Sequence, residues 1–160
     1  MSKSALRESI LANLRATLAL QVNAAQLARD EAISEESRAK NQYDTHSLEA
    51  GYLAEGQARQ AVEIEESIRL ISVLALPEFI AAAPIALGAL VEIHDERGRA
   101  TWYFLSPRAG GLELPHLRHT VLVVTPSSPL GRQLLGRYVG DTVQLPGRKP
   151  GAASRIASVQ

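Results

Sequence analysis

The 160-residue sequence predicts an α+β protein: an N-terminal antiparallel coiled-coil hairpin over residues 1–76, then a small β-rich domain over residues 77–160. The two parts differ in their content of charged residues, proline and glycine. Residues 1–76 carry 8 Lys+Arg against 11 Asp+Glu, contain no proline and hold two of the 11 glycines. Residues 77–160 carry 9 Lys+Arg against 6 Asp+Glu and hold all eight prolines. Such a shift indicates two parts of different architecture.

The first helix is predicted from residues 4–29, which contain no glycine or proline and are rich in helix formers. Apolar and small residues recur there at alternating spacings of three and four, which is typical of a coiled-coil seam. A second run over residues 45–75 repeats the pattern. The predicted seams are Leu11, Leu14, Leu18, Gln21, Ala25, Ala28 and Ala32, and Ala50, Ala54, Gln57, Ala61, Ile64, Ile68, Ile71 and Ala75.

Side-chain size changes in opposite directions along the two seams, which favours an antiparallel hairpin with a bulky base. Its large residues would then face one another, Leu11, Leu14 and Leu18 against Ile64, Ile68 and Ile71. Two helices of a compact bundle are the alternative, but no third amphipathic helix is visible. Gly51 and Gly56 in the second helix would allow either close approach of the helices or a bend.

A polar turn region is predicted between the helices, over residues 30–44. It is either a solvated turn with capping acids or an acidic tip presented at the end of the hairpin. Its five carboxylates are Asp30, Glu31, Glu35, Glu36 and Asp44.

The second half predicts strands around one short helix. Ser128 suits the N-cap of that helix, Pro129 its first position and Gly136 a left-handed C-terminal cap. Arg132 and Arg137 either face an acidic partner or are plain surface charges. Strands are expected over residues 89–94, 100–105, 120–125, 142–145 and 153–159, with a hairpin turn at 95–98.

Several classes of function are excluded. The absence of cysteine rules out disulfides, thiolate zinc sites and cysteine nucleophiles, and the balanced charge argues against non-specific coating of nucleic acid. No apolar run reaches the roughly 20 residues of a membrane span, and the N-terminus lacks a signal-peptide core, so a cytoplasmic protein is expected. The Gly110–Gly111 region lacks phosphate-loop spacing, and His116 and His119 lack partner ligands. We therefore expect no enzyme activity, no metal site and no cofactor.

The segment Ser-Pro-Leu-Gly-Arg-x-Leu-Leu-Gly over residues 128–136, followed by Gly-Asp at 140–141, resembles the Gre family of bacterial transcription elongation factors. Residues 41–45 and 49–59 resemble the start of the second coiled-coil helix of a Gre-like branch. The resemblance implies an FKBP-like C-terminal domain that docks on RNA polymerase, while the coiled coil enters the secondary channel. DNA and RNA would be met only indirectly, and no membrane is involved.

Carried onto this chain, the resemblance implies two sites. Polymerase docking falls on Ser128, Pro129, Leu130 and Arg132. The acids nearest the polymerase active site, where they would approach its Mg²⁺, are Glu35 and Glu36 first, then Asp30, Glu31 and Asp44.

The tip departs from the family pattern Asp-x-x-Glu-Asn-Ala-(Glu/Asp)-Tyr. Alignment on Tyr43 places Glu36 at the Asp position but Ala39 at the Glu position. Alignment on Asn41 places Ser37 and Lys40 there instead. Neither register supplies both acids, so stimulation of transcript cleavage is expected to be weak or absent.

Two other functions remain open from the sequence. One is a coiled-coil interaction module that does not act on RNA polymerase. The other is a prolyl isomerase, which is disfavoured because a proline pocket needs converging aromatics and only Trp102, Tyr103 and Phe104 cluster.

Overall fold

The computed structural model describes residues 2–38, 45–80, 82–116, 119–147 and 153–160. These form two compact units, one of Met1–Leu11 with Leu70–Gln160 and one of Ala12–Arg69. The unit that contains the sheet therefore includes the first turns of helix α1 and the end of helix α2. The predicted domain boundary at residue 76 stays a prediction.

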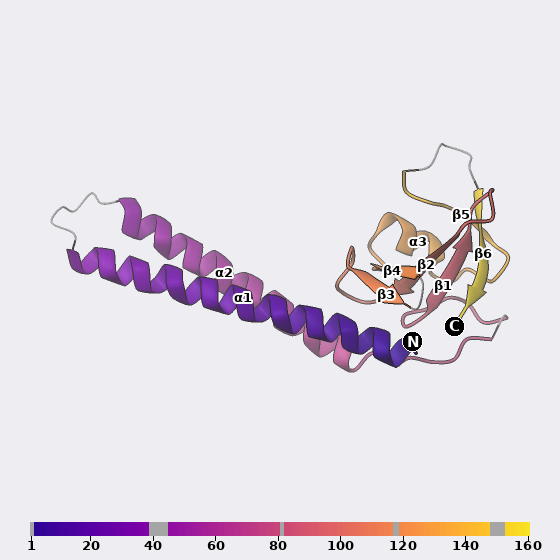
Figure 1. Cartoon of the computed structure of the whole chain (residues 1–160), viewed down its shortest axis with the longest axis horizontal. Coiled ribbons are helices and arrows are strands. Elements are labelled where there is room, and N and C mark those ends of the chain that lie inside the picture. The colour runs from indigo at the N-terminus through magenta and orange to yellow at the C-terminus, as the bar shows by residue number, and fades with distance from the viewer. Residues whose placement is uncertain (1, 39–44, 81, 117–118, 148–152) are drawn as a thin grey trace. The chain divides into compact units, whose positions relative to one another are not determined.

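Two long helices, α1 (Lys3–Arg38) and α2 (Thr45–Ser72), lie side by side, and their residues 12–38 and 45–69 belong to the second unit (Figure 1). The side chains of Ala32 and Ala50 lie outside the described part of the chain. For the other predicted seam residues, burial confirms the prediction with one exception. Ala75 is exposed and lies beyond the end of α2, so its assignment to the seam was wrong. The confirmed seam residues are buried or half-buried: Leu11, Leu14, Leu18, Gln21, Ala25, Ala28, Ala54, Gln57, Ala61, Ile64, Ile68 and Ile71.

Helix α1 continues nine residues beyond Arg29, to Arg38. Residues 30–38 contain neither glycine nor proline and include Glu, Ala and Arg, which favour helix, so nothing stops the helix earlier. The predicted turn region therefore begins later than expected. In α2, a Cβ on Gly56 would meet no atom within 4 Å, so close helix approach does not explain this glycine.

The sheet has six strands in the order β3-β4-β2-β1-β6-β5 (Figure 1). Strand β4 is parallel to β2, and the other pairs are antiparallel. The short edge strand β3 was not predicted, because Pro115 interrupts its pattern; an edge strand tolerates proline, which leaves no ladder donor missing inside the sheet. The strands are β1 (Leu90–His94), β2 (Ala100–Leu105), β3 (Glu113–His116), β4 (His119–Val124), β5 (Thr142–Gln144) and β6 (Ala153–Val159).

The main core lies between one face of the sheet and helix α3 (Pro129–Leu134). Val91, Ile93 and Tyr103 of the sheet pack there in one buried cluster with Leu130 and Leu134 of α3. The opposite face carries buried Leu90, Phe104, Leu114, Val121 and Val123, while Leu6, Ile10, Ile71 and Leu74 are buried within the same unit. Apolar side chains on both faces and on the helix ends thus stabilise this unit.

Among the described residues, no helix is both long enough and apolar enough to cross a membrane. Nor do the described His, Asp and Glu side chains come together in a group of three or more suited to a metal ion.

Candidate functional site

The N-terminus of α3 is built by hydrogen bonds between Ser128 and Thr125. The Gly131 amide donates to Ser128 Oγ at 3.0 Å, and this hydroxyl donates to the Thr125 carbonyl at 2.8 Å. The Ser128 amide also donates to the Thr125 carbonyl, at 2.9 Å. Pro129 follows in the first turn, where no amide is needed. The predicted N-cap is confirmed, and it holds the start of α3 against the end of β4.

Gly131 is required where α3 meets the end of β4. A Cβ at this position would lie 1.9 Å from the Thr125 carbonyl oxygen, closer than any real contact. The backbones can approach only because residue 131 has no side chain. The Gly of the Ser-Pro-Leu-Gly-Arg segment is therefore explained by packing.

A pocket of about 320 Å³ opens beside this helix start. Its surface is mostly apolar, and it has no aromatic residue in its lining. A pocket of this kind suits one apolar anchor side chain of a partner. The lining residues are Gly110, Gly111, Leu122, Val123, Val124, Thr125, Ser128, Pro129, Leu130 and Pro146.

Gln133, for which no sequence pattern predicts a role, links α3 to strand β5. Its side-chain nitrogen donates to the Gln144 carbonyl at 3.2 Å, and the Gln144 amide donates to Gln133 Oε1 at 2.9 Å. The Gln133 side-chain amide thus pairs with both backbone polar groups of Gln144, as the backbone of a neighbouring strand would. A glutamine on a six-residue helix carries no signal that would have revealed this contact.

The four predicted docking residues lie together but differ in what they can touch. Pro129 and Arg132 are exposed, and the Arg132 guanidinium forms no ion pair with any described residue. Leu130 is 2% exposed and is available to a partner only through the pocket wall. The Ser128 hydroxyl is already used in the cap. Pro129 and Arg132 can therefore contact a partner directly, whereas Ser128 positions them.

Four of the five predicted acidic tip residues, Asp30, Glu31, Glu35 and Glu36, belong to the C-terminal part of α1. Asp30 and Glu31 are exposed, and Asp30 Oδ1 accepts a hydrogen bond from Gln26 Nε2 at 2.7 Å. Asp30 lies about 12 Å from the end of the helix at 1.5 Å per residue. Glu35 and Glu36 belong to the last turn of α1, but their side chains lie outside the described part of the chain, as does Asp44 entirely.

The carboxylates at this end of α1 oppose the helix dipole. Acidic groups are favoured at a helix N-terminus and disfavoured at its C-terminus, where the unpaired carbonyls carry partial negative charge. Glu31, Glu35 and Glu36 nevertheless lie in the last turns of the helix.

The described histidines contribute to a separate polar cluster on the sheet. His94 Nε2 lies 2.8 Å from Glu92 Oε1, and the Ser158 hydroxyl donates to Glu92 Oε2 at 2.8 Å. Burial raises the pKa of Glu92, but the hydrogen bonds from His94 and Ser158 outweigh it and hold the pKa below its usual value. The ring of His119 lies 5.9 Å from that of Trp102. This cluster joins β1 to β6 and contains no residue of either predicted site.

No protein-family model matches the chain, and no curated protein matches its sequence. Among solved structures, it is similar to a crystal structure of GreA factor homolog 1 (Gfh1) of Thermus thermophilus, with 24% identity, 94% of each chain covered and a TM-score of 0.39. It is also similar to Thermus aquaticus Gfh1, with 22% identity, 92% of each chain covered and a TM-score of 0.36. A further structure described as the transcription factor Gfh1 shares 22% identity over 93% of this chain and 92% of its own, with a TM-score of 0.35.

Proposed function

We propose that this chain is a Gre-like transcription factor that binds RNA polymerase and inserts its coiled coil into the secondary channel. It regulates elongation, pausing or initiation as a cofactor of the polymerase and has no turnover of its own. Two features support the proposal together. One is the Ser-Pro-Leu-Gly-Arg segment at a capped helix start, and the other is a two-helix hairpin with acids at the far end of α1.

The observation that carries the proposal is the apolar pocket of about 320 Å³ beside exposed Pro129 and Arg132. The start of α3 lines the pocket with Ser128, Pro129 and Leu130, and the exposed Arg132 follows on the same helix. Such a surface is suited to a partner that presents an apolar anchor and an acid. Three of its lining residues, Ser128, Pro129 and Leu130, belong to the segment 128–136 that carries the family resemblance.

We further propose that stimulation of transcript cleavage is weak. Two-metal catalysis needs a carboxylate placed to ligate the second Mg²⁺. The sequence offers Glu36 with Ala39, or Ser37 with Lys40, at the two positions that the family fills with acids. The protein would then act mainly by occupying the channel.

Arg132→Glu tests the docking proposal. Reversing the charge of this exposed residue of α3 is expected to weaken polymerase binding at least about ten-fold, because an attraction to an acid becomes a repulsion. Arg97→Glu is the matched control, since Arg97 is an exposed arginine in the β1–β2 turn, outside the pocket. Binding is measured by fluorescence anisotropy of labelled protein titrated with core polymerase. Equal affinity for Arg132→Glu and Arg97→Glu would contradict the docking site.

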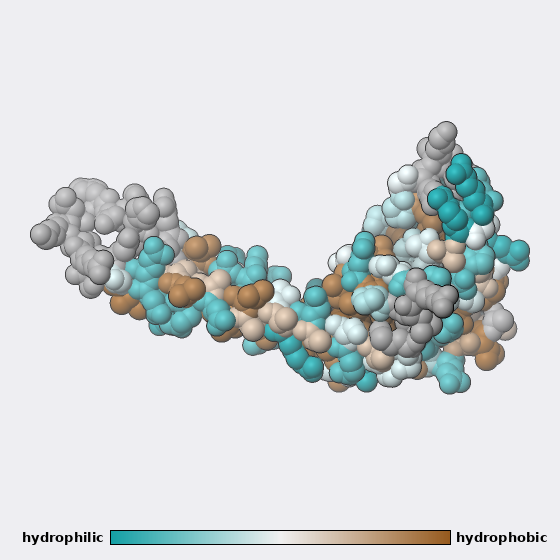
Figure 2. Space-filling model, viewed as in Figure 1, coloured by the Kyte–Doolittle hydropathy of each residue, from teal (hydrophilic) through white to brown (hydrophobic). Residues whose placement is uncertain are grey.

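The alternative of an interaction module that does not act on polymerase has one observation in its favour. Several large apolar side chains of the helical hairpin are exposed, with Leu20 at 69%, Leu27 at 71% and Tyr52 at 73%. Hydrophobic side chains accordingly stand among hydrophilic ones along the hairpin surface (Figure 2). If wild-type protein shows no affinity for polymerase, this alternative replaces the proposed function.

A further inference from the structure

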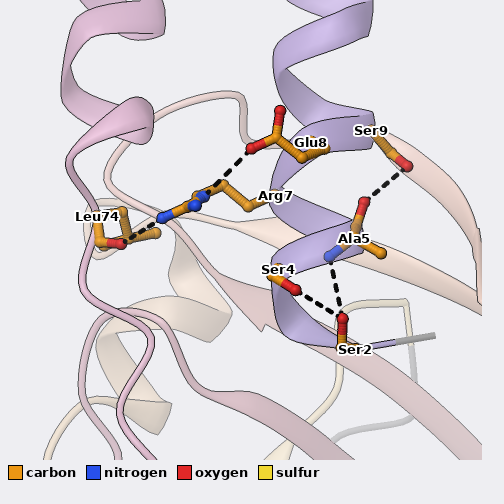
Figure 3. A network of polar contacts seen from close by, with 7 residues as sticks. All are labelled: Ser2, Ser4, Ala5, Arg7, Glu8, Ser9 and Leu74. Atoms are coloured by element: carbon orange, nitrogen blue, oxygen red, sulfur yellow. Dashed lines mark hydrogen bonds and ion pairs between the residues drawn. The ribbon is translucent and has the colours of Figure 1, made fainter.

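The first turns of α1 carry two cations against the expected charge pattern of a helix. Lys3 opens the helix, Arg7 follows one turn later, and the first turn contains no acid. Cations at a helix N-terminus lie beside unpaired amides with partial positive charge and therefore destabilise the helix end. The N-terminal amides instead receive a hydroxyl, since the Ala5 amide donates to Ser2 Oγ at 3.3 Å (Figure 3). Within α1, Arg7 Nε also lies 3.7 Å from Glu8 Oε1, whereas the first turn offers Lys3 no acid (Figure 3).

Both cations reach the backbone of the segment that follows α2. Arg7 Nη1 donates to the Leu74 carbonyl at 3.2 Å, across the space between the two chain segments in Figure 3. Lys3 Nζ donates to the Pro77 carbonyl and lies 5.0 Å from the centre of the Phe79 ring. Carbonyls just past a helix C-terminus are the groups that cations stabilise best. Arg7 thus stabilises the end of α2 through the Leu74 carbonyl, and Lys3 stabilises the segment that follows it through the Pro77 carbonyl.

The same segment is held from its other side by the start of the sheet. The Ala75 carbonyl lies so close to Gly88 that a Cβ there would be 2.3 Å from its oxygen. Residues 73–80, here called the linker, are therefore fixed between the first turns of α1 and the residues that lead into β1. All of these groups belong to one compact unit.

We propose that Lys3 and Arg7 form a charge-dependent latch that holds the linker by its Leu74 and Pro77 carbonyls, and that neutralising either cation releases the linker without weakening α1. The surroundings of Lys3 disfavour its charged form. Burial lowers the pKa of Lys3, and the nearby carboxylate of Glu78 raises it again only in part. Loss of that charge, by substitution or by acylation of the amine, removes the cation–π contact and the charge-assisted hydrogen bond together. This device does not depend on the proposed polymerase partner.

Cleavage by glutamyl endopeptidase gives a direct readout, because the Glu78–Phe79 bond lies inside the linker. Glu96, in the exposed β1–β2 turn of the same molecule, serves as an internal control site. Lys3→Gln and Arg7→Gln are each expected to raise the cleavage rate at Glu78 roughly ten-fold, because each removes one charge-assisted hydrogen bond that holds the linker. The cleavage rate at Glu96 should stay unchanged. Lys3→Arg retains the cation and should cleave like the wild type. Arg59→Gln, at an exposed position of α2, is the matched control.

Helix content separates a latch from an ordinary stabilising contact. Because Lys3→Gln removes a cation that opposes the α1 dipole, the circular dichroism signal at 222 nm is expected to stay equal or increase. Wild-type cleavage at Glu78 in both glutamine variants would overturn the proposal. So would a parallel rise at Glu96 or a loss of helix signal, since either would show general destabilisation.

Discussion

At the scale of single residues, the glycines show most clearly which positions the fold constrains. Position 131 must be glycine, because a Cβ there would clash with the Thr125 carbonyl. A Cβ at Gly56, in the middle of α2, would meet no atom within 4 Å. Both occur in segments that carry the family resemblance, and the sequence alone does not separate them. The difference arises from what lies next to each Cβ position.

Substituting these two glycines by alanine should therefore change stability in opposite directions. Gly131→Ala is expected to destabilise by about 1–3 kcal/mol or more, because the clash is with backbone that cannot turn away. Gly56→Ala is expected to stabilise by up to about 1 kcal/mol through helix propensity. Urea unfolding followed by circular dichroism measures both. A neutral Gly131→Ala would show that α3 can move away from β4, contrary to the geometry described.

At the scale of elements, the β1–β2 turn depends on one carboxylate. The Asp95 side chain accepts hydrogen bonds from the Arg99 and Arg97 amides, both at 2.9 Å, and from Arg99 Nε at 2.8 Å. The backbone hydrogen bond from Arg99 is the largest cause that lowers the pKa of Asp95 from 3.8 to about 2, against an opposing effect of burial. Asp95 thus stabilises this turn only while it is ionised.

The pH dependence follows from the sign of that shift. Because the folded pKa is lower than the unfolded one, the stabilisation is fully present above about pH 4 and is lost as the pH falls towards 2. Asp95→Asn should remove this contribution, so the melting temperatures of variant and wild type should converge between pH 4 and pH 2. Thermal melts at pH 7, 4, 3 and 2 test this. A constant difference across that range would contradict the assignment.

The elements that the sequence predicted correctly are those with a local signal. The seams have a spacing of three and four, and Ser128 and Pro129 define the start of α3 within two residues. Strand β3 was missed because its four residues include Pro115 and owe their conformation to pairing with β4. The end of α1 was placed too early because acidic residues were read as a turn, although they do not break a helix.

The candidate sites, too, were predictable only where their signal is local in the sequence. The helix start at Ser128 was predictable, but the pocket beside it was not, because Gly110 and Gly111 join it from a loop remote in sequence. Gln133 and the contacts of Lys3 and Arg7 are likewise long-range. These contacts join residues that are far apart in the sequence, so only the fold reveals them.

At the scale of the whole molecule, helix α1 has charges that oppose its dipole at both ends. Lys3 and Arg7 lie at the N-terminal end, and Glu31, Glu35 and Glu36 lie at the C-terminal end. At the first end the structure supplies the compensation, through the carbonyls of Leu74 and Pro77.

The central claim is that this chain occupies the secondary channel of RNA polymerase, and competition on backtracked elongation complexes tests it most directly. Stalled complexes are assembled with the polymerase of the source organism and an ordinary Gre factor, and transcript shortening is followed as this protein is added. We predict that cleavage by the Gre factor declines as the protein saturates the polymerase, and that the protein alone produces little shortening. Undiminished cleavage at saturating protein would contradict occupation of the channel.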